Sequence, residues 1–185
     1  MANYATTTYK IEGPTPILQN LHNMLESLRN GNIKPSQDYP EDWEGTVIHL
    51  LGGSIKGYSM RGTITDSNLN DGVLTIYAEE AWSVTDFRHA LTDVYPDLTV
   101  YFRTEECGCD VFISNDVDGK YFSEDCLLDA CFDGDGYSEY FATYEDACQY
   151  LLERTGFSDP DKYNELNPDG DSFAYIHTFE FSTEF

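Results

Sequence analysis

Residues 129–146, DACFDGDGYSEYFATYED, concentrate the side chains that could do chemistry. The stretch holds six acidic residues and no basic one. Carboxylates at this density can bind hard divalent cations, attract a basic partner, or keep a protein soluble. The three roles place different demands on the neighbouring residues, so the sequence can be tested against each.

Calcium binding is the first of these roles. Residues 114–125, SNDVDGKYFSED, come near the EF-hand loop, which needs oxygen ligands at its first, third, fifth and twelfth positions. Asp116 and Asp118 fit the third and fifth positions, but Ser114 and Asp125 are poor ligands at the first and twelfth. The flanking VFIS and KYF favour strands over the required helices, so we expect a β-turn within a hairpin here.

Cysteine chemistry is the second candidate. The five cysteines are an odd number with irregular spacing, which favours free thiols in a reducing compartment. Cys107 and Cys109 would point to the same side of a strand and could form half a metal site or a redox pair. Gly108 favours a bulge or turn equally well. A carboxylate site without EF-hand geometry, among Asp133, Asp135 and Glu139, is a weaker alternative.

Motifs of nucleophilic catalysis do not occur in this chain. The four histidines lie outside any recognisable pattern, and no Gly-x-Ser-x-Gly, P-loop or Rossmann fingerprint is present. The sequence therefore predicts no cofactor, no metal ligand set and no catalytic residue, and it favours a protein that is not an enzyme.

The distribution of charge is the strongest signal in the sequence. The net charge is -24, and residues 104–185 contain 21 acidic but only 3 basic side chains. Nucleic acids and anionic membranes are bound by clustered Lys and Arg, so direct binding to either is not expected. A basic or DNA-binding protein is the partner that this charge fits, and solubility alone is the competing explanation.

We expect an acidic contact surface over residues 104–146 and 159–171. Carboxylates spaced along it could imitate the phosphates of a duplex and compete for proteins that bind DNA. The residues expected to form it are Asp110, Asp116, Asp118, Glu124, Asp125, Asp129, Asp133, Asp135 and Glu139.

Hydrophobic periodicity and turn chemistry predict the strands and helices that carry these residues. Strands are expected at 3–12, 60–66, 73–81, 97–106, 109–115 and 172–185, and helices at 15–29, 40–51, 84–95 and 143–155, while 158–171 reads as a long polar loop. Ser83 and Thr143 are expected to cap helices, with Asp38 a further candidate cap. The first part, β-α-(α)-β-β-α-β, is typical of a ferredoxin-like split βαβ sandwich.

The run EEAWSVTDFRHALTDVYPDLTVYFRTEECGCDVFISND resembles the YubB ferredoxin-like domain family of plasmids, phages and other mobile elements. The shared features are an acidic residue before Ala-Trp-Ser, the helix after it, Tyr-Pro-Asp-Leu, and a strand ending in Glu-x-x-Gly. The resemblance covers roughly 40–140. It implies the fold and a mobile-element origin, and it carries no assigned activity.

These observations predict an α+β protein with a ferredoxin-like core, an antiparallel sheet and a C-terminal acidic β/α extension. We expect a single domain over 1–185, with the core at roughly 1–125 and the extension at roughly 126–185. We expect a cytoplasmic location, because no apolar run reaches the length of a bilayer span and the N-terminus lacks a signal peptide. The expected function is protein binding as a mobile-element accessory factor, with DNA mimicry of the anti-restriction type as its sharpest form. The alternative is a metal-dependent or thiol enzyme using Cys107, Cys109, Asp133 and Asp135.

Overall fold

The computed structural model describes residues 3–35, 39–167 and 170–185 of an α+β protein. The chain divides into two compact units, Met1–Val111 and Phe112–Phe185. The sequence placed the change from core to extension near residue 125, whereas these units meet at residue 111. The candidate cap Asp38 lies outside the described residues.

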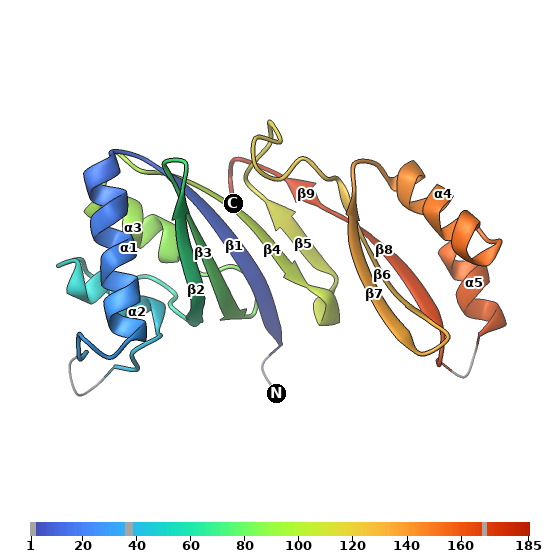
Figure 1. The fold of residues 1–185 in the computed structure, drawn as a ribbon, viewed down its shortest axis with the longest axis horizontal. Coiled ribbons are helices and arrows are strands. Elements are labelled where there is room, and N and C mark those ends of the chain that lie inside the picture. Colours follow the sequence, from blue (N-terminus) through green and yellow to red (C-terminus); the bar gives the residue numbers. More distant parts are fainter. Residues whose placement is uncertain (1–2, 36–38, 168–169) are drawn as a thin grey trace. The chain divides into compact units, whose positions relative to one another are not determined.

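An antiparallel sheet forms the frame of the first unit (Figure 1). Its strands follow the order β2-β3-β1-β4, with β1 paired to both β3 and β4. The bounds are β1 Tyr4–Glu12, β2 Gly62–Asn70, β3 Val73–Ala81 and β4 Thr99–Glu106. Asp71 and Gly72 join β2 to β3 as a two-residue turn with φ of 50° and 78°, so β2 runs four residues beyond the predicted strand end.

Helices α1 (Thr15–Arg29), α2 (Glu44–Leu50) and α3 (Phe87–Val94) belong to the first unit. The predicted helix at 15–29 is confirmed as α1, and four of its leucines are buried: Leu18, Leu21, Leu25 and Leu28. Helix α2 is shorter than the predicted helix at 40–51, and Leu50 is exposed while Glu44 at its start is fully buried. Because glutamate is polar, the hydrophobic pattern of the sequence did not predict that Glu44 is buried.

Ser83 does not cap α3, contrary to the sequence prediction. It has a left-handed φ of 69°, and the helix begins only at Phe87. The Thr85 hydroxyl accepts a bond from the Phe87 amide at 3.3 Å, while the Asp86 carboxylate accepts one from the Ser59 amide at 2.7 Å. The helix therefore starts later than predicted, and the Asp86 carboxylate bonds the loop at Ser59.

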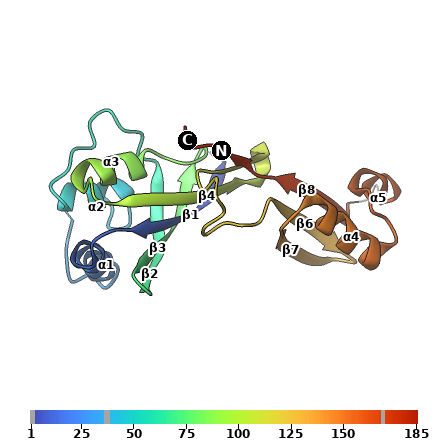
Figure 2. The same ribbon diagram turned by 90° about the horizontal axis from the view of Figure 1, so that it is seen from above.

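The second unit contains a three-stranded sheet in the order β7-β6-β8, with α4 and α5 on one of its faces (Figure 2). The strands of the second unit are β5 Val111–Ser114, β6 Cys126–Phe132, β7 Asp135–Phe141, β8 Phe173–Thr178 and β9 Glu180–Phe181. Strand β5 starts at Val111, which is the last residue of the first unit. Strands β5 and β9 pair in parallel. Leu128, Ala130 and Phe132 of β6 pack with Leu151 of α4 to form the core.

Helix α4 (Tyr144–Thr155) matches the sequence prediction, including both of its ends. The Thr143 side chain accepts a bond from the Asp146 amide at 3.1 Å, and Gly156 ends the helix with a φ of 83°. Among the described residues, no helix is long and apolar enough to cross a bilayer.

The predicted polar loop at 158–171 is wrong, because it contains helix α5 (Pro160–Leu166). Asp159 caps the helix, accepting bonds from the amides of Asp161 and Lys162 at 3.1 and 3.4 Å. Pro160 occupies the first turn, where its missing N–H costs nothing. Polar composition obscured this cap, and only one residue of the helix, Tyr163, is buried.

Candidate functional site

The acidic residues singled out in the sequence fall into several environments. Asp110 is exposed after a short 3₁₀ turn of the first unit, and the others belong to the second unit. Asp118, Asp125, Asp133, Asp135 and Glu139 are exposed, whereas Glu124 and Asp129 are half-buried.

Asp116 is buried and must be removed from the predicted contact surface. Its carboxylate accepts bonds from the backbone amides of Lys120, Tyr121 and Phe122 at 3.1, 2.6 and 3.0 Å. These bonds stabilise the turn that follows β5. They also occupy the backbone amides of residues 120–122, KYF, which a strand would need for pairing with a neighbour. The predicted hairpin across this turn is wrong for this reason.

The remaining acidic residues do not share one face. The β6–β7 register pairs Leu128 with Glu139 and Phe132 with Asp135, so both acids lie on the face that carries α4 and α5. Asp129 of β6 alternates with these core residues and lies on the opposite face. The carboxylates thus surround the second unit instead of forming one flat patch.

The two edges of the three-stranded sheet differ in how they are covered. At the β8 edge, the Asn164 side chain of α5 donates to the Ala174 carbonyl and accepts from the Ala174 amide, both at 2.8 Å. A side-chain amide thereby occupies a position that a neighbouring strand would take. At the other edge lies β7, which pairs with β6 alone among the described strands.

The cysteines do not form a site of the kind considered from the sequence. Cys107 and Cys109 are exposed in a 3₁₀ turn rather than a strand, and Asn3 Nδ2 lies 2.6 Å from Cys109 Sγ. Burial first, and then the charge of Asp125, raises the pKa of the Cys126 thiol to about 11. A raised pKa removes the thiolate that nucleophilic and metal-binding cysteines need.

Metal binding by side-chain clusters finds no support in the described part of the chain, where no three His, Cys, Asp or Glu side chains are grouped to hold an ion. Cys107 and Cys109 lie in the first unit, whereas Asp133 and Asp135 lie in the second.

A pair of buried carboxylates was missed in the sequence. Glu44 of α2 and Glu80 of β3 are both fully buried. The Thr85 hydroxyl lies within hydrogen-bond distance of both, at 2.7 Å from Glu44 and 3.0 Å from Glu80, and its single proton serves one of them. Tyr9 and Thr7 also donate to Glu80. Each hydroxyl replaces water that the carboxylates lost on burial.

The environment of Glu44 favours its protonated form. Burial raises the pKa of Glu44 well above its usual range, and the hydrogen bond and charge of Glu80 raise it further. Glu44 Oε1 has no donor, whereas Glu44 Oε2 accepts from the Gly62 amide at 3.1 Å. Burial and the charge of Glu80 both oppose ionisation of Glu44, so its neutral form is favoured. With no exposed surface, the pair has no direct access to a substrate.

The turn after Glu80 is strained. Trp82 and Ser83 have φ of 62° and 69°, a region that costs L-residues roughly 1–2 kcal/mol each. Trp82 is 60 % exposed, and the Arg61 guanidinium lies 5.5 Å from its ring centre. Arg61 Nε also donates to the Ala81 carbonyl at 2.8 Å, which secures the turn.

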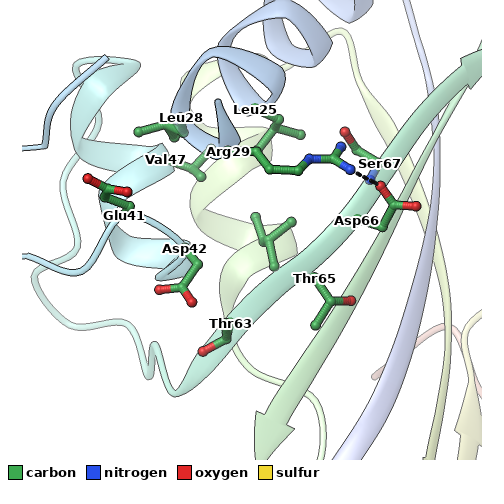
Figure 3. Close-up of a pocket in the computed structure, with 11 residues that line it drawn as sticks. Leu25, Leu28, Arg29, Glu41, Asp42, Val47, Thr63, Thr65, Asp66 and Ser67 are labelled. Atoms are coloured by element: carbon green, nitrogen blue, oxygen red, sulfur yellow. Dashed lines mark hydrogen bonds and ion pairs between the residues drawn. The ribbon is translucent and has the colours of Figure 1, made fainter. Parts of the chain in front are cut away.

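A pocket of about 600 Å³ opens between α1, the start of α2 and β2 (Figure 3). Its apolar lining comprises Leu25, Leu28, Val47 and Ile64. Arg29 points toward Asp66 and forms ion pairs with Asp66 and Glu26, so its charge is already compensated. The hydroxyl of Ser67, another lining residue, lies 3.3 Å from His22 Nδ1.

The comparisons with known proteins give no further guide: no family model, no curated protein and no solved structure matches this chain.

Proposed function

We propose that this protein acts by binding a basic protein through the acidic surface of its second unit. The observation that carries the proposal is the segregation of charge. Residues 112–185 contain 18 acidic and 3 basic side chains. In the described part of this unit, Asp116 is the one acidic residue that is buried. The rest are available to act on a partner at long range.

The few basic side chains of the unit do little to neutralise this charge. Lys162 pairs with its own helix cap Asp159 at 3.1 Å. The Arg154 guanidinium lies 5.5 Å from the ring centre of Phe132. The field outside the unit therefore stays negative, which favours rapid, salt-sensitive encounter with a positively charged surface.

A ferredoxin-like first unit and a mobile-element origin complete the proposal. The order β2-β3-β1-β4, with α1 between β1 and β2 and α3 between β3 and β4, supports a split βαβ topology. The resemblance to the YubB-like family rests on the run that includes Glu80, Ala81 and Trp82. In that setting the protein serves as a cytoplasmic accessory factor of the element.

DNA mimicry is the sharpest form of the proposal. A partner that binds duplex phosphates with Lys and Arg would use the same groups on the carboxylates of this unit. Their spread around both faces of the sheet favours a partner that wraps or clamps. Duplex DNA should then compete with this protein for the partner.

The test is affinity capture from host lysate on the immobilised full chain, with stepwise salt elution and identification of the eluted proteins. The test variant is Asp133→Asn, Asp135→Asn and Glu139→Gln. The matched control is Asp71→Asn, Glu79→Gln and Asp97→Asn in the first unit. Asp71 and Asp133 both precede a glycine in two-residue turns with positive φ, so the two sets disturb the backbone alike.

We expect specific basic or DNA-binding proteins to elute between low and moderate salt. They should be depleted by the second-unit variant, retained by the first-unit control and displaced by added duplex DNA. Equal depletion by both variants would show that binding depends only on the net charge of the protein. Retention of the same proteins on all three baits would contradict the proposal.

A further inference from the structure

We propose that β7 is a docking edge, to which an extended basic segment of the partner adds as a further strand. This inference rests on the proposed function and gives it a site. An edge strand presents unpaired backbone N–H and C=O groups, which natural proteins usually cover or blunt. Here the β8 edge is covered by Asn164 of α5, whereas β7 ends the sheet on the other side.

Strand β7 has few of the usual features that prevent strand addition. It runs over seven residues, DGYSEYF, in unbroken register with β6, without a bulge, a proline or a lysine. Most of its residues are exposed. Its backbone can therefore support an added strand along most of its length.

Turn geometry decides which backbone groups face outward. Asp133 and Gly134 have φ of 55° and 88°, which is the type I′ turn of a two-residue hairpin. In such a hairpin the closing pair is hydrogen-bonded and the pairs then alternate. Asp135, Tyr137 and Glu139 thus direct their backbone groups to β6, whereas Gly136 and Ser138 direct theirs outward.

Charge selects the occupant of the edge. Asp135 and Glu139 lie four residues apart on the face that carries α4, and Glu145 and Asp146 occupy the first turn of that helix. A second copy of β7 would place carboxylates beside carboxylates, which destabilises a sheet. A strand with Lys or Arg at alternate positions would instead place a positive charge beside each acid.

The main test uses the full chain and two synthetic peptides of about eight residues, close to the length of β7. The first alternates Lys with Val or Thr. The second has the same sequence and charge but is N-methylated at every backbone nitrogen, so neither of its edges can donate to a ladder. Affinities are measured by calorimetry or fluorescence anisotropy at low salt.

We expect the unmodified peptide to bind and N-methylation to weaken it at least about tenfold, equivalent to about 1.4 kcal/mol. Ser138→Pro should weaken binding of the unmodified peptide to a similar degree, since it removes an outward N–H while leaving the β6 ladder intact. Ser138→Ala keeps that N–H and should bind as the parent does. If Ser138→Pro does not fold, the two peptides on the parent chain decide the question.

Equal affinity for both peptides would overturn the docking edge and leave the proposed function standing, because attraction would then depend on charge alone. Absence of binding by either peptide at low salt would also overturn the edge. The proposed function would in that case be judged separately by the lysate capture and its two variants.

Discussion

The buried carboxylates Glu44 and Glu80 show how far a single residue can depart from its expected place. Glutamate is almost never fully buried unless it is paired. Here the hydroxyls of Thr7, Tyr9 and Thr85 supply hydrogen bonds, and the raised pKa of Glu44 favours its neutral form. Arg88, packed at 4.8 Å from the Phe102 ring centre, adds a positive charge that acts on Glu80.

Replacing Glu44 by Gln should stabilise the fold at neutral pH, by about 1–3 kcal/mol, because a neutral donor takes the place of the proton. The pKa of Glu44 is raised on folding, so the native state binds the proton more tightly than the unfolded state. The parent therefore loses stability as the pH rises from about 4.5 through the raised pKa of the native state.

Urea unfolding of the parent and Glu44→Gln across pH 4–8 checks this prediction. The difference between the two curves should grow with pH, since the many exposed carboxylates contribute equally to both. A constant difference over the whole range would contradict a raised pKa of Glu44 in the native state.

Asp116→Asn should destabilise the protein by about 1–3 kcal/mol, because one amide oxygen cannot replace a carboxylate that accepts three backbone N–H bonds. Asp118→Asn, two residues along and exposed, is the matched control and should change stability little. Chemical denaturation of both variants measures the difference, and equal losses would contradict the structural role of Asp116.

At the scale of elements, capping residues decide where helices begin in the second unit. Thr143 satisfies the Asp146 amide, and Asp159 does the same for α5. Both caps are readable in the sequence as a Thr or Asp before a helical segment. The α5 cap was overlooked because its helix buries too little apolar surface to show a periodic pattern.

Removing the α4 cap with Thr143→Ala should cost about 1 kcal/mol, while Thr143→Ser should restore most of it because serine keeps the hydroxyl. Thermal or urea unfolding reports the loss. If the Ala and Ser variants are equally stable, the hydroxyl does not act as a cap.

Net charge affects the stability of the whole molecule. A net charge of -24 opposes compaction through self-repulsion, and salt screens that repulsion. The melting temperature should therefore rise as NaCl is increased from about 10 mM to about 500 mM, over which the screening length falls several-fold.

Calorimetric melting in NaCl, and in MgCl2 or CaCl2 at matched ionic strength, checks this expectation. Similar curves for all three salts would fit screening. A much larger gain with one divalent cation would indicate a specific ion site and contradict a purely screening effect.

The α+β class, most strands and helices of the first unit, the ends of α4 and the concentration of acid toward the C-terminus were all predictable from the amino-acid order. These properties depend on local periodicity, turn chemistry and composition, which need no partner from elsewhere in the chain. Only the tertiary structure placed Asp116 in the interior, paired Glu44 with Glu80, and left β7 at an edge while Asn164 covered β8. Each of these depends on contacts between distant segments. The sequence alone does not indicate whether a carboxylate will be hydrogen-bonded by water or by another segment of the chain.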